Sequence, residues 1–236
     1  LMIRRPPRST QGVSSAASDV YKRQLCKHAL KLGCKGVMTL PPFYFKGMSD
    51  DGLFDYYLKL IDGIDDPNLK IYLYHIPQVS GVGLSIDLVK RLFAEFSGVV
   101  VGIKDSSGDW ENTKALLGIK GLIVYPGAEL PVIDAIRLGA PGCISATANL
   151  NGSDISEVID LCHAGKWEEA EEKHKKVRAV RLMFQDYAPI PAQKALLAKA
   201  TGNRNWENLR PPMQPMTADK LSTLGDHLAN QFDMHF

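Results

Sequence analysis

No apolar run in the 236 residues approaches the roughly 20 residues that a membrane-spanning helix needs, because glycine or charge interrupts each one. Glycine-rich phosphate-binding motifs of the Walker or Rossmann kind are missing as well. So is any stretch in which basic residues alternate with aromatic ones. We therefore expect no membrane, no nucleic-acid partner and no cofactor.

Cysteine is scarce, and no two cysteines form a CxxC pair or metal-finger spacing. This pattern predicts buried, reduced thiols in a reducing compartment, and hence a cytoplasmic protein. The acidic loop of Asp62, Asp65 and Asp66 is expected to be solvated, so we predict no metal site. The four cysteines are Cys26, Cys34, Cys143 and Cys162.

The composition, 45% hydrophobic and 23% charged residues, is typical of a soluble globular protein with a substantial core. The net charge is +2, but residues 1–24 carry five basic side chains and one acidic one, so the rest of the chain carries −2. No basic domain is therefore expected after residue 24.

Residues 1–24 show neither helical nor strand periodicity and no secretory core, so we expect them to lie outside the fold. They resemble translated sequencing-adapter read-through, which predicts a non-native or disordered leader. A basic, serine-rich targeting arm is the alternative, although no amphipathic stripe supports it.

From Leu25 onwards, short β-branched runs alternate with amphipathic segments, a pattern typical of βα units and a parallel sheet. After Asn149 only helices are expected. Five strands with helical crossovers fit either a doubly wound sheet or part of an eight-stranded barrel. The expected strands are 36–40, 71–75, 99–104, 122–125 and 142–146, and the expected helices are 50–64, 85–96 (with Ser85 as N-cap), 110–118, 129–138, 153–164, 167–187, 190–201 and 217–230.

The apolar strand that begins at Val99 ends in Lys104, which places an amine at the carboxyl edge of the sheet, where barrel enzymes build active sites. Partial removal from water favours the neutral amine that attacks a carbonyl. A lysine that simply turns into solvent at the strand exit is the alternative on the strand pattern alone.

Three aromatic residues follow or end neighbouring strands at the same rim. Tyr74 could shuttle protons beside an amine, or it could be an ordinary core tyrosine. Tyr44 lies in an aromatic loop that could wall a pocket, complete a proton relay or pack on a neighbouring subunit. His75 alternates with Tyr74 and points to the opposite face, so we interpret it as a structural residue or as one that supports the site indirectly.

Five motifs occur in one order: Tyr74-x-x-Pro77, the Gly102-Ile-Lys-Asp-Ser-Ser-Gly window, Tyr125-Pro-Gly-Ala-Glu, Gly142-Cys-Ile-Ser-Ala-Thr-Ala-Asn and Pro189-Ile-Pro. In order and spacing they resemble the dihydrodipicolinate synthase/N-acetylneuraminate lyase family of class I Schiff-base aldolases. The resemblance covers Leu25 to Phe236.

This resemblance implies a (β/α)₈ TIM barrel with a C-terminal helical extension, usually a homotetramer. The five expected strands match the fourth to eighth of that barrel, so residues 25–150 are expected to form a partial barrel and 151–236 the helical region. The resemblance also implies roles for six residues: Lys104 as the nucleophile, Tyr74 and Tyr44 as proton-relay tyrosines, and Ser106, Gly127 and Ile144 as residues that line the substrate pocket.

Two departures from the family pattern matter. The first three βα units and their carboxylate-binding loop have no counterpart, so we expect the incomplete chain to be inactive and poorly soluble. The synthases also carry an arginine two residues after the Tyr-x-x-Pro proline, where this sequence has Val79. Valine cannot pair with the carboxylate of an incoming aldehyde.

The resemblance therefore predicts a Schiff-base aldolase or lyase that acts on pyruvate or a related 2-oxo acid and an aldehyde. One alternative is 4-hydroxy-tetrahydrodipicolinate synthase of lysine biosynthesis, with another cation in place of the missing arginine. Another is a non-catalytic 2-oxo-acid-binding or degenerate family member.

Overall fold

The computed structural model describes residues 19–236, which divide into two compact units. The first unit ends at Gly127 and the second comprises Ala128–Phe236. This division falls before the domain boundary at residue 150 that the sequence suggested. The segment 128–150, expected to belong to the partial barrel, therefore lies with the helices of the second unit.

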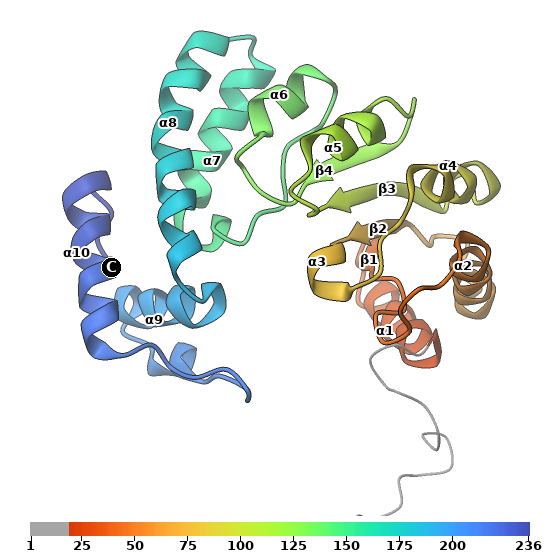
Figure 1. Cartoon of the computed structure of the whole chain (residues 1–236), viewed down its shortest axis with the longest axis horizontal. Coiled ribbons are helices and arrows are strands. Elements are labelled where there is room, and N and C mark those ends of the chain that lie inside the picture. Colours follow the sequence, from red (N-terminus) through yellow and green to blue (C-terminus); the bar gives the residue numbers. More distant parts are fainter. Residues whose placement is uncertain (1–18) are drawn as a thin grey trace, which may run out of the picture. The chain divides into compact units, whose positions relative to one another are not determined.

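The first unit is built on a parallel sheet of four strands in the order β1-β2-β3-β4, in sequence order (Figure 1). The strands are β1 (Val37–Thr39), β2 (Ile71–His75), β3 (Val100–Asp105) and β4 (Ile123–Pro126). The helices are α1 (Asp19–Lys31), α2 (Asp50–Ile64), α3 (Pro77–Ser80), α4 (Ile86–Glu95) and α5 (Trp110–Leu117). Four of the five expected strands are thus confirmed. Strand β2 has its expected bounds, and each end of the other three strands is shifted by one residue.

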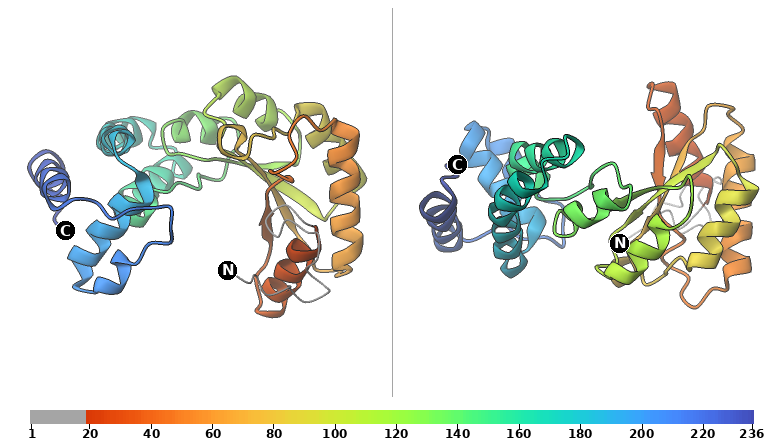
Figure 2. Two further views of the ribbon diagram at one scale, coloured as in Figure 1. Left: turned by 60° about the horizontal axis from the view of Figure 1, so that its bottom comes forward. Right: turned by 90° about the horizontal axis from the view of Figure 1, so that it is seen from above.

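Helices α2 and α4 cover one face of this sheet (Figure 2). Their amphipathic faces present Leu60 and Leu92 to strand residues such as Leu73, and each of these three side chains is fully buried. The helix starts are set by side-chain caps: Ser49 accepts the Gly52 N–H, and Ser85 accepts the Leu88 N–H at 3.0 Å. The predicted N-cap at Ser85 is confirmed.

The start of the first unit differs from expectation. Helix α1 begins at Asp19, so residues 19–24, which we expected to lie outside the fold, form its first two turns. Lys22 from this part donates hydrogen bonds to the carbonyls of Leu40 and Pro41, just after β1. The expected leader residues 1–18 lie outside the described part of the chain.

The second unit contains α6 (Val132–Arg137), α7 (Ala148–His163), α8 (Trp167–Met183), α9 (Pro189–Thr201) and α10 (Ala218–Phe232), with short 3₁₀ turns at Phe184–Asp186 and Arg204–Glu207. Every helix predicted after Asn149 is confirmed in type. Helix α7 begins five residues early and contains a kink at Asn151, whose φ is −120°.

The expected strand at 142–146 is wrong. Only Ile144 of its five residues is β-branched, and the segment forms no ladder with another strand among residues 19–236. Its side chains instead serve a buried polar group: the hydroxyls of Ser145 and Thr147 both donate to the carboxylate of Glu129, which is fully buried. Hydrogen bonds to Glu129, instead of a neighbouring strand, therefore hold this segment in position.

The cysteines are free thiols, as expected, but they are not uniformly buried. Cys26 and Cys162 are buried, whereas Cys34 is exposed. Burial, together with the negative charge of Glu129, raises the pKa of the Cys143 thiol to about 12, so this thiol stays protonated.

Candidate active site

Lys104 and Tyr74 lie side by side on adjacent strands of the first unit. They are partners in the register of β2 and β3. The Lys104 amine donates to the Tyr74 hydroxyl at 3.2 Å and lies 4.4 Å from the centre of the tyrosine ring. The two residues that the sequence singled out first are therefore brought together at the carboxyl edge of the sheet.

The period of two along the strands explains which side chains join this pair. Tyr72 and Tyr74 share one face of β2, while His75, in register with Asp105, lies on the other face with the core. His75 is 7% exposed, and its Nδ1 accepts the Leu84 N–H at 2.9 Å. The structural interpretation of His75 is confirmed, and burial lowers the pKa of its imidazole.

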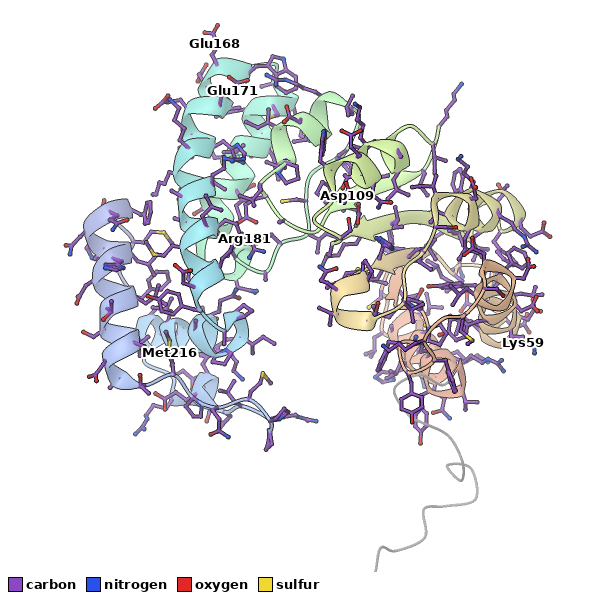
Figure 3. The ribbon with its side chains drawn as sticks, viewed as in Figure 1. Lys59, Asp109, Glu168, Glu171, Arg181 and Met216 are labelled. Carbon is purple, nitrogen blue, oxygen red and sulfur yellow. The ribbon has the colours of Figure 1, made fainter. Side chains whose placement is uncertain are left out.

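The loop that follows Lys104 is anchored by Asp105. This carboxylate is 3% exposed and accepts hydrogen bonds from the Ser107 N–H (2.9 Å), the Asn112 amide (3.0 Å) and the Thr113 hydroxyl (2.7 Å). Asp109 then caps α5 by accepting the Glu111 N–H at 2.9 Å (Figure 3). A satisfied, buried carboxylate next to Lys104 therefore fixes the end of β3.

Ser106 and Gly127 meet at the same edge. The Ser106 N–H donates to the His75 carbonyl at 2.7 Å, and the Gly127 N–H donates to the Asp105 carbonyl at 2.6 Å, which extends the ladder beyond the strand ends. A Cβ atom at Gly127 would lie 1.9 Å from the Ser106 hydroxyl oxygen, so only glycine fits there. Gln78 of α3 donates to the Ser106 carbonyl at 2.5 Å.

The other two expected site residues are Tyr44 and Ile144. Tyr44 lies in the loop after β1, is 67% exposed and packs edge-on against Phe45 with ring centres 5.5 Å apart. No contact of Tyr44 with Lys104 or Tyr74 is found within the described part of the chain. Ile144 belongs to the second unit, where it is 37% exposed in the segment before α7. Their roles stay predictions.

The sequence reading missed two residues next to Lys104. Tyr125 of β4 is in register with Lys104 on the side opposite Tyr74, and Asp105 anchors the loop. Strand alternation combined with sheet order could have found Tyr125. Burial and the neighbouring Tyr72 raise the pKa of the Tyr125 phenol, which stays protonated.

Residues 19–236 contain neither a metal-binding cluster nor a membrane-spanning helix. No group of three or more histidine, cysteine, aspartate or glutamate side chains is arranged to hold a metal ion. None of the described helices has the length and apolar character needed to cross a bilayer.

A paired lysine and tyrosine at the carboxyl edge of a parallel sheet invite comparison with known enzymes. The model of the dihydrodipicolinate synthetase family matches residues 13–231. The chain belongs to this family. Members of the dihydrodipicolinate synthetase family act as aldolases or synthases, so the residues described above are those of an enzyme family.

Curated relatives include a DapA-like lyase of Chloroflexus aurantiacus, which is 30% identical over 85% of the chain and 66% of the relative. The 4-hydroxy-tetrahydrodipicolinate synthase of Geotalea daltonii is 30% identical over 82% of the chain and 65% of the relative. The chain thus spans about two thirds of the length of these relatives.

Solved structures agree with this assignment. The dihydrodipicolinate synthase of Agrobacterium tumefaciens matches 94% of the chain and 77% of its own length, with 28% identity and a TM-score of 0.81. The YagE protein of Escherichia coli K12, solved in complex with pyruvate, matches 92% of the chain and 73% of its own length, with 21% identity and a TM-score of 0.79. This likeness implies the TIM-barrel fold, of which the described residues contain a parallel sheet of four strands.

Proposed function

We propose that the protein is a class I aldolase or lyase in which Lys104 forms a Schiff base with pyruvate or a related 2-oxo acid. The observation that carries the proposal is the 3.2 Å hydrogen bond between the Lys104 amine and the Tyr74 hydroxyl. A nucleophilic amine with a proton donor at hydrogen-bond distance is the arrangement that imine formation requires.

In the proposed reaction, the Lys104 nitrogen adds to the C2 carbonyl of the 2-oxo acid, and a proton passes from nitrogen to the new hydroxyl oxygen. Tyr74 then donates its proton to that hydroxyl, which leaves as water, so that an iminium forms. The resulting phenolate accepts a proton from C3, and the enamine attacks the aldehyde carbonyl to form the carbon–carbon bond, while the Tyr74 phenol returns that proton to the new alkoxide oxygen. Water then hydrolyses the iminium, which releases the product and the Lys104 amine. Cleavage follows the same steps in reverse.

The acceptor is the less defined substrate. Val79 on α3 is 75% exposed and offers no charge to an acceptor carboxylate. Lys46 donates to the carbonyl of Ser80, the last residue of α3, and to that of Phe43. These features favour an aldehyde without a carboxylate over the acceptor of 4-hydroxy-tetrahydrodipicolinate synthase.

Reductive trapping tests the proposal. The chain is treated with pyruvate and borohydride, and its peptides are mapped by mass spectrometry. We expect one reduced pyruvate per chain, attached to Lys104. Imine formation needs the lysine, the relay tyrosine and a 2-oxo acid but no acceptor, so trapping is independent of complete turnover.

Two variants make the result specific. Lys104→Arg should abolish the adduct, whereas Lys114→Ala, which removes an exposed lysine on α5, should leave it unchanged. Pyruvate binding detected by calorimetry without any adduct at Lys104 would support the non-catalytic 2-oxo-acid-binding alternative and overturn the aldolase proposal.

A further inference from the structure

Tyr74, Lys104 and Tyr125 form one row across three adjacent strands. The register pairs Tyr74 with Lys104 and Lys104 with Tyr125, so all three side chains project from the same face of the sheet. Neighbouring strands lie about 4.8 Å apart. Lys104 is therefore flanked by a tyrosine on each side, and among residues 19–236 only Tyr74 accepts a hydrogen bond from its amine.

Tyr125 is held in place by a second tyrosine one row away. The Tyr72 and Tyr125 rings have centroids 6.1 Å apart and an interplanar angle of 56°. This contact crosses β3 at Gly102, where a Cβ atom would lie 2.7 Å from Cδ1 of Tyr72. The absence of a side chain at Gly102 is thus what allows the Tyr72 ring to lie over β3 towards Tyr125.

The Tyr72 ring is also confined from the side of β1. A Cβ atom at Gly36 would lie 3.2 Å from Cε2 of Tyr72, so the ring packs closely between the glycines at 36 and 102. Because Tyr72 has little room to move, it restricts the Tyr125 ring that contacts it. The face beside Lys104 is therefore lined by a supported aromatic ring rather than by a flexible side chain.

We propose that Tyr125 is a specificity-determining residue that limits the size of the C3 substituent on the 2-oxo acid bound to Lys104. This inference rests on the proposed function. Tyr74 occupies one flank of the amine, so the carbon chain of the imine extends along the other flank, which the Tyr125 ring walls. The C3 methyl group of pyruvate fits beside a ring at the neighbouring strand position, whereas longer or branched chains meet it.

The hydroxyl of Tyr125 is not required for this role. It has no hydrogen-bond partner among the described residues, and its raised pKa keeps it neutral, so it provides no charge for recognition. The ring itself supplies the steric limit. Removing the hydroxyl and removing the ring are therefore expected to have different effects.

The test measures borohydride trapping at Lys104 with pyruvate, 2-oxobutanoate and 2-oxopentanoate. For the unaltered chain we expect the trapping rate to fall about tenfold or more for each added methylene, since a steric limit of one methylene is worth about that much. Tyr125→Ala should bring the three rates to within about threefold of one another. Tyr125→Phe should keep the original preference.

The controls separate this inference from the proposed function. No pyruvate adduct on the unaltered chain would defeat the proposed function itself. An adduct whose chain-length preference is unchanged in Tyr125→Ala, or is lost already in Tyr125→Phe, would overturn the specificity role alone.

Folding is controlled in two ways. Tyr56→Ala removes a partly buried tyrosine of α2 that packs on the core, and it should not alter the preference. If Tyr125→Ala does not fold, Tyr125→Leu provides an apolar replacement that is smaller than tyrosine and fills more space than alanine. The same loss of chain-length preference is expected from it.

Discussion

The Lys104 amine lies 3.2 Å from the Tyr74 hydroxyl and 4.4 Å from the centre of the Tyr74 ring. Tyr74 therefore contacts the amine both through its hydroxyl oxygen and through the π face of its ring. Both contacts follow from the register that places the two residues opposite each other on parallel strands.

Tyr74→Phe removes the proton donor but keeps the ring. We expect the rate of imine trapping at Lys104 to fall about 100- to 10,000-fold, because a positioned acid–base group contributes about that much. Pyruvate binding, measured by calorimetry, should change little. Tyr187→Phe, a tyrosine of the second unit, serves as a control. A trapping rate unaffected by Tyr74→Phe would remove Tyr74 from the relay.

Asp105→Ala tests how the loop after Lys104 is held. The change leaves the Ser107 N–H, the Asn112 amide and the Thr113 hydroxyl without their acceptor. Because unpaired buried donors cost about 1–3 kcal/mol each, partly offset by water, we expect a loss of about 3 kcal/mol in the free energy of unfolding. Urea denaturation measures this loss.

The matched control for Asp105 is Asp87→Ala, which removes an aspartate whose side chain is 90% exposed. Its effect should stay below about 0.5 kcal/mol. Equal effects of the two substitutions would show that the Asp105 contacts do not stabilise the first unit. A lower trapping rate in Asp105→Ala at temperatures where it remains folded would show that the loop also positions Lys104.

His75 predicts a dependence of stability on pH. Its Nδ1 accepts the Leu84 N–H, an interaction that only an unprotonated Nδ1 can make, and burial lowers its pKa although Asp105 opposes the shift. The folded pKa therefore lies below the unfolded value of about 6.5. Its contribution to stability is fully present above about pH 6.5 and is lost as the pH falls through the folded pKa.

Urea unfolding of the unaltered chain and of His75→Gln at pH 8, 6.5 and 5 checks this sign. The unaltered chain should lose more stability between pH 6.5 and 5 than the variant does, because glutamine does not titrate. His174 is buried with a lowered pKa in the second unit and contributes equally to both proteins. A steeper loss in the variant would contradict the assignment.

Local patterns were enough to predict most elements but not their neighbours. The run Asp50–Ile64 has a helical apolar period, and Ile71–His75 alternates with period two, so both were predicted with their observed bounds. The segment 142–146 was also predicted as a strand, although only Ile144 in it is β-branched. A strand, however, requires a partner, and the hydroxyls of Ser145 and Thr147 instead satisfy Glu129.

The difference between local patterns and pairing between elements also decides which site residues could be predicted. Lys104 and Tyr74 could be predicted because strand ends and alternation are local properties. Tyr125 could not be chosen without knowing that β4 is the neighbour of β3, and the anchoring of Asp105 by Asn112 and Thr113 joins a strand end to the next helix. Residues whose role depends on pairing between elements are thus missed when each element is considered alone.

The edges of the sheet predict the behaviour of the 236-residue chain by itself. Among the described residues, β1 and β4 are paired with another strand on one side only. Unpaired strand edges promote association between chains. We therefore expect the isolated chain to aggregate or self-associate and to show no aldol turnover. Light scattering coupled to size exclusion, with a coupled turnover assay, checks both points; a monodisperse monomer with steady turnover would refute them.

Val79→Arg tests the choice of acceptor. Val79 is 75% exposed on α3, so an arginine side chain can be accommodated there without displacing the core. Its guanidinium could form a bidentate pair with an acceptor carboxylate, and such charge-assisted bonds are worth about 1.5–3 kcal/mol. In any preparation of the enzyme that catalyses turnover, we expect KM for an aldehyde that carries a carboxylate to fall about tenfold or more. KM for an uncharged aldehyde of the same length should stay the same.

Val79→Gln, which adds polarity and length without charge, is the control. If Val79→Arg improves both aldehydes equally, or neither, then the acceptor does not contact α3, and Val79 says nothing about which aldehyde the enzyme uses.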